Sequence, residues 1–190
     1  MGLIYGDPPT EATRMLREIV AEFYPPLANL KEDIDVRIRF VESEAEGASP
    51  LKVGGWPADA VVSVVPLRHR ACGGPDVLIE VDAHAWEWRS ERQRRALLHH
   101  ELHHIDVVDL KESRERPGVW LCKLDTCGRP KVKLRPHDWQ LGGFRELAEL
   151  YEEDAPEVMG LRSAVAQLDQ GVFDFARAPN EPATLSINAG

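Results

Sequence analysis

The chain has 190 residues, of which 43% are hydrophobic and 29% are charged, and this is the balance of an ordinary soluble globular protein. A chain of this length suits one domain that buries a core without disulfides. The chain has only three cysteines, a small and odd number that does not fit a disulfide framework. The first residues lack the basic and apolar regions of a signal peptide, and no apolar stretch is long enough to span a membrane. We therefore expect a cytoplasmic protein with no membrane association.

The formal net charge is −9, which makes the chain a poor candidate for a general nucleic-acid binder. The charge is unevenly distributed: the net values are −7 for residues 1–110, +5 for 111–135 and −7 for 136–190. The usual meaning of a short basic block is a solvated hairpin.

The first half of the chain predicts one helix and three strands. Apolar residues recur at helical spacing over 12–23, and two prolines end that helix. Apolar and charged residues alternate over 34–41, which is typical of a half-buried strand. The β-branched run 60–65 predicts a buried strand, and 77–81 predicts a third one.

The second half begins with a capping box, in which Ser90 and Gln93 satisfy each other's backbone amides at the start of a helix that runs to about Asp109. The later predicted elements are short strands at 119–124 and 131–134, which form a hairpin, and helices at 141–153 and 156–170. This order of elements predicts an α+β domain over residues 1–175, followed by a flexible tail at 176–190.

Residues 100–104 read His-Glu-Leu-His-His and satisfy the pattern H-E-x-x-H. Residues four apart share one face of a helix, so His100 and His104 can coordinate a single cation. Glu101 lies roughly 100° around the helix from His100 and can reach a metal-activated water without being a ligand, as a general base must. Two neutral imidazoles suit zinc best among the common ions.

His99 and His103 are also four residues apart, which makes the register of the motif ambiguous. The residue after His99 is a histidine, so only the pair His100 and His104 carries the adjacent carboxylate. We therefore interpret His99 and His103 as solvated or hydrogen-bonded helix residues.

A catalytic zinc needs a third protein ligand and one open position. The extended metzincin pattern is excluded, because Val107 and Leu110 stand where it needs glycine and histidine. His137 is the favoured third ligand, because a lone histidine just ahead of a helix is otherwise unexplained, and Asp138 beside it could orient a ligand histidine. The rival ligands are Glu146, Glu149 and Glu153 on the following helix.

The motif at 100–104, followed by Pro136-His137-Asp138 and a helix containing Phe144, resembles the putative phage metallopeptidases, which are SprT-like zincins. The similarity extends over roughly residues 12–155. It implies a minimal zincin-like α+β domain in which a small mixed sheet packs against an active-site helix and flanking helices. It also implies that the histidine just ahead of the helix, His137, is the third ligand.

Together these features predict a zinc-dependent metallopeptidase with one catalytic Zn²⁺, held by His100, His104 and His137. Glu101 takes a proton from the metal-activated water and passes it to the leaving amine. The expected partner is a protein or peptide substrate that pairs with the strand at 77–81, in the host cell cytoplasm if a phage encodes the chain.

Two other functions stay open. One is a non-catalytic, zinc-containing phage protein that binds a host protein. The other is a DNA-associated SprT-like protease, because the basic block at 111–135 lies between the second and third expected ligands and could flank the cleft. Nucleic acid is the less favoured partner, and the sequence indicates no oligomeric state.

Overall fold

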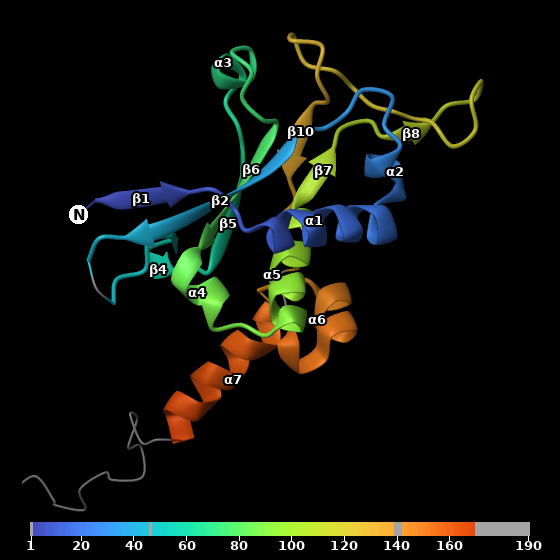
Figure 1. Cartoon of the computed structure of the whole chain (residues 1–190). Coiled ribbons are helices and arrows are strands. Elements are labelled where there is room, and N and C mark those ends of the chain that lie inside the picture. The colour runs from blue at the N-terminus through green and yellow to red at the C-terminus, as the bar shows by residue number, and fades with distance from the viewer. Residues whose placement is uncertain (1, 46, 139–141, 170–190) are drawn as a thin grey trace, which may run out of the picture.

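The computed structural model describes residues 2–45, 47–138 and 142–169, and its centre is a four-stranded mixed sheet (Figure 1). The strand order is β1 (Leu3–Gly6), β2 (Val36–Ser43), β6 (Val77–Asp82) and β5 (Ala60–Val64). β2 and β6 are parallel, whereas β1 runs antiparallel to β2 and β5 antiparallel to β6. The predicted α+β class with a small mixed sheet is confirmed.

β6 lies inside the sheet, so the prediction that the strand at 77–81 is the peptide-binding edge is wrong. Val77, Ile79 and Val81 are fully buried, as suits a strand with a partner on each side. β5 precedes β6 in the chain but pairs with it on the side away from β2, and therefore takes the edge position. Chain order alone cannot show which of two consecutive strands lies outside.

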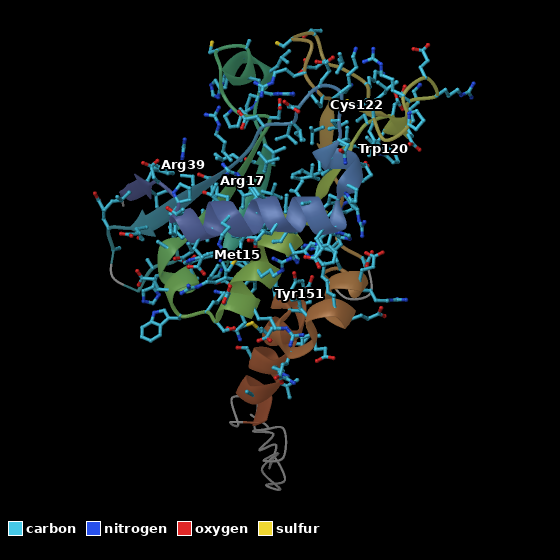
Figure 2. The ribbon with its side chains drawn as sticks, turned by 45° about the vertical axis from the view of Figure 1, so that its right-hand side comes forward. Met15, Arg17, Arg39, Trp120, Cys122 and Tyr151 are labelled. Carbon is cyan, nitrogen blue, oxygen red and sulfur yellow. The ribbon has the colours of Figure 1, made fainter. Side chains whose placement is uncertain are left out.

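The core is formed by one face of this sheet and by two helices, α1 (Thr10–Phe23) and α5 (Glu91–His103). Met15 is almost completely buried and lies on the side of α1 that faces α5 (Figure 2). Leu98 and Leu102 of α5 are fully buried against the sheet residues Ile79 and Val81 in the same cluster. The predicted capping box at Ser90 and Gln93 begins α5.

Short elements connect these parts. They are the short helices α2 (Pro25–Ala28), α3 (Leu67–Arg70) and α4 (Ala83–Glu87), and a hairpin whose strands β3 (Lys52–Val53) and β4 (Trp56–Pro57) have two residues each. Gly54 and Gly55 turn this hairpin with positive φ values of 60° and 90°, which other residues rarely adopt. The Asp82 carboxylate accepts hydrogen bonds from two amides at the start of α4.

α5 ends at His103, earlier than the predicted Asp109, because the next residues join a strand pair. β7 (Ile105–Val107) runs antiparallel to β10 (Val132–Leu134), and β8 (Lys111–Glu112) to β9 (Trp120–Leu121). Ile105 and Val107 are buried in that pairing, which outweighs the helical tendency of the segment. The predicted hairpin of 119–124 with 131–134 is reduced to a single bridge between Leu124 and Pro130.

The C-terminal helices pack on another face of α5. α6 (Arg145–Tyr151) is followed by a 3-10 turn (Glu152–Asp154) and by α7 (Pro156–Asp169), which extends away from the domain (Figure 1). Phe144, Leu147, Tyr151 and Ala155 form a second buried cluster with Ala96 of α5. The predicted boundary at residue 175 and the tail at 176–190 lie outside the described residues. No described helix is both long and apolar enough to cross a membrane.

The basic block is partly neutralised by acidic residues from other parts of the chain. Arg129 forms ion pairs with Asp76 and Asp35, Lys133 with Asp106, and Arg135 with Glu146. Asp76 is fully buried and also pairs with buried Arg70, so this charge cluster fastens the 125–130 turn to the sheet.

Candidate metal centre

The end of α5 presents two histidines on one face. His100 is buried in the last turn, and His104 is the half-buried C-cap residue. The His104 Nδ1 lies 2.7 Å from the carbonyl oxygen of Arg135. Because a carbonyl can only accept a hydrogen bond, Nδ1 carries the ring proton and Nε2 keeps a free lone pair.

His137 reaches the same place from the segment that follows β10. The Arg135 N–H donates to the His104 carbonyl at 2.7 Å, so two hydrogen bonds hold this segment against the end of α5. One nitrogen each from His100, His104 and His137 lies within 4.8 Å of the other two, and the Nε2 atoms of His100 and His137 are 3.0 Å apart. The structure thus brings together the three residues that the sequence predicts as ligands.

The geometry and the chemistry of this cluster fit a tetrahedral metal ion. Two nitrogens bound at about 2.0–2.1 Å in a tetrahedral site are roughly 3.3 Å apart, which is close to the spacing of His100 and His137. Metal binding needs neutral imidazole. Burial lowers the pKa of His104 to about 4 and also lowers the pKa of His137, so both rings are neutral at pH 7. The three imidazoles can therefore hold a metal ion here.

Glu101 follows His100 on α5, and its side chain is buried beside the cluster. Burial raises the pKa of Glu101 to about 7, although the neighbouring His100 and a hydrogen bond from the Val62 amide act in the opposite direction. A carboxyl whose pKa lies near neutrality can both accept and release a proton at physiological pH. Glu101 lies outside the cluster of three histidines.

His100, Glu101, His104 and His137 line a cleft with a volume of about 330 Å³. β5 lines it through Ala60, Val61 and Val62, and Val53 of the β3–β4 hairpin also contributes to the lining. Leu134 of β10 and Pro156 at the start of α7 also line it. The open edge of the sheet therefore lies directly beside the three histidines.

The sequence matches the family model described as putative phage metallopeptidase over residues 7–165. The chain belongs to this family. No curated protein and no solved structure matches it.

In this phage metallopeptidase family member, the three rival glutamates lie outside the histidine cluster. Glu146 accepts a hydrogen bond from His103 Nε2 at 2.8 Å and pairs with Arg135, and Glu153 pairs with Arg162. Glu149 is exposed on α6. The Asp138 carboxylate, which the sequence suggests as an orienting group for a ligand histidine, accepts a hydrogen bond from the Arg145 amide at 3.0 Å at the start of α6.

His99 and His103 are hydrogen-bonded helix residues. His99 Nδ1 lies 3.1 Å from the Tyr151 hydroxyl, and His103 Nδ1 lies 2.8 Å from the Tyr24 hydroxyl. Burial lowers the pKa of His99 to about 4, so this ring stays neutral inside the protein. The two rings thus join α5 to α6 and to the end of α1.

Sequence reasoning missed two residues of this centre. The ring of fully buried Phe144 has its centroid 4.6–5.1 Å from the ring centroids of His100, His103, His104 and His137. Glu157 of α7 has an oxygen 2.8 Å from His100 Nδ1. The sequence marks Phe144 only as part of the helix after His137 and assigns no site role to it; Glu157 is 57 residues away from His100 and has no motif around it.

Proposed function

We propose that this chain is a zinc-dependent peptidase of the SprT-like zincin type, which uses Glu101 as general base. The observation that carries this proposal is the convergence of three imidazoles and one buried carboxyl in a cleft beside an open sheet edge. Structural zinc sites are closed by four protein ligands, whereas three ligands leave a position for chemistry. The described residues supply three.

His100, His104 and His137 would hold the zinc. When bound, zinc polarises the scissile carbonyl and makes water acidic enough to lose a proton near neutral pH. The Glu101 carboxylate accepts that proton and then donates it to the leaving amine, which its position beside the ligands and its pKa near 7 support. The edge of β5 can pair with an extended peptide and align the scissile bond with the histidines.

The expected partner is a protein or peptide, and the expected location is the cytoplasm of the host cell. Arg129, Lys133 and Arg135 are engaged in ion pairs, which leaves less of the basic block for a polyanion. Retention on DNA that falls steeply with salt would instead favour the DNA-associated protease.

The proposal is tested by cleavage of unfolded casein and of a random peptide library with the zinc-loaded protein. We expect cleavage by the natural chain and a loss of about 100-fold or more for Glu101→Gln, since an amide cannot accept the proton. Glu149→Gln, an exposed glutamate on α6, is the matched control and should keep full activity. Equal turnover by Glu101→Gln would contradict the mechanism. Zinc binding with no cleavage of any peptide would favour the non-catalytic host-binding protein.

A further inference from the structure

Glu157 lies at the second position of α7 and is buried in spite of its charge, with its side chain 1% exposed. Its Oε1 lies 2.8 Å from His100 Nδ1 and accepts a hydrogen bond from the Phe144 amide at 3.0 Å. Its Oε2 is also buried and has no hydrogen-bond partner among the described residues. Such a placement is unfavourable for a carboxylate unless the contacts of Oε1 compensate for it.

The surrounding chain is built to accept this side chain. Residue 143 is a glycine, and a Cβ built at this position would lie only 1.8 Å from the Glu157 Cγ. Any larger residue at 143 would therefore displace the Glu157 side chain. Gly143 also accepts a hydrogen bond from the Asp138 amide, one residue after His137. Gly143 thus links the space for Glu157 to the residue that follows the third histidine.

The contact decides which nitrogen of His100 faces the other histidines. Glu157 Oε1 already accepts the Phe144 N–H and so faces His100 as an acceptor, which means that Nδ1 carries the ring proton and Nε2 keeps its lone pair. Burial raises the pKa of Glu157, but the hydrogen bonds from His100 and Phe144 outweigh this effect, and the pKa lies below its ordinary value.

We propose that Glu157 is a positioning residue of the metal centre, which fixes the tautomer and the ring orientation of His100, and that Gly143 provides the space for it. This inference rests on the metal site of the proposed function. It makes the start of α7 part of the metal centre, although no residue of α7 is in the histidine cluster. Carboxylates that accept from a metal-binding imidazole typically change metal affinity 10–100-fold.

The first measurement is zinc affinity by competition with a chromophoric chelator. We expect the zinc affinity of Glu157→Ala to fall 10–100-fold. The affinity of Glu157→Gln should fall less, because the amide oxygen can still accept a hydrogen bond from His100. Glu149→Gln should bind zinc like the natural chain. Gly143→Ala should also lose affinity, because its Cβ collides with Glu157. Circular dichroism of each variant shows whether the fold is retained, and Glu157→Gln, of equal shape, covers the case in which Glu157→Ala does not fold.

The second measurement is the ¹⁵N spectrum of the histidines in the metal-free protein, which does not depend on zinc or on activity. We expect His100 to carry its proton on Nδ1 in the natural chain and the Nε2–H form to become populated in Glu157→Ala. A folded Glu157→Ala with zinc affinity within twofold of the natural chain, or a His100 that is protonated on Nε2 in the natural chain, would overturn the inference. A natural chain that binds no zinc but shows the expected tautomer would instead refute the proposed metal site.

Discussion

Replacing Glu101 by glutamine should stabilise the metal-free protein, and the gain should depend on pH. Burial raises the pKa of this carboxyl from 4.5 to about 7, so the folded chain holds the proton more tightly than the unfolded chain. Below about pH 4.5 the group is protonated in both states and has no effect on stability. Between pH 4.5 and 7 only the unfolded chain releases the proton, so the free energy of unfolding falls as the pH rises.

The size of the effect follows from the shift. A change from 4.5 to about 7 corresponds to roughly 3 kcal/mol, and the almost complete burial of Glu101 leaves little solvent to screen it. Glutamine has the same shape and no charge. The free energy of unfolding of Glu101→Gln should therefore exceed that of the natural chain by about 3 kcal/mol above pH 7 and by about zero below pH 4.5. Zinc should reduce this difference, because its positive charge favours the ionised carboxylate.

The assay is urea unfolding in the presence of a chelator from pH 4 to 8, followed by tryptophan fluorescence. Glu149→Gln is the control and should differ little from the natural chain at every pH, since it replaces an exposed side chain. If the stability gained by Glu101→Gln were constant with pH, or grew as the pH falls, burial would not be what raises the pKa of Glu101, and the reasoning would be refuted.

Three further substitutions test the parts that support the site. Phe144→Ala should lower the free energy of unfolding by about 3–5 kcal/mol and weaken zinc binding, because its ring packs against all three histidines; unchanged zinc affinity would contradict this. Arg70→Ala should lower stability by about 3–5 kcal/mol in urea unfolding, since it leaves buried Asp76 without one partner, and a loss below about 1 kcal/mol would argue against that pair. Ser90→Ala should lower stability by about 1 kcal/mol through the lost cap, with zinc content unchanged.

The parts of the site that obey local rules could be predicted from the sequence. Ser90 and Gln93 cap α5 as their spacing predicts, and residues four apart place His100 and His104 on one face. His137 could be proposed because a lone histidine ahead of a helix had no other explanation. Its arrival at the cluster depends on the pairing of β7 with β10, which no local pattern encodes.

Features that depend on distant pairing could not be predicted. The inner position of β6, where the sequence predicted an edge strand, is decided by its parallel pairing with β2, over 40 residues away in the chain. Glu157 is placed in the centre by contacts with His100 and Phe144, which lie 57 and 13 residues away, and its neighbours in the sequence give no sign of them. In both cases tertiary contacts outweigh the local pattern.

The zinc content of the purified protein tests the central claim most directly. We predict about one zinc per chain after dialysis of the natural protein, as a site of three imidazoles implies, and little or none for His100→Ala, His104→Ala or His137→Ala. Glu149→Ala should retain the metal, since its exposed side chain lies outside the cluster. A natural protein without zinc after zinc loading, or a His137→Ala variant that holds zinc as tightly as the natural chain, would contradict the three-histidine site.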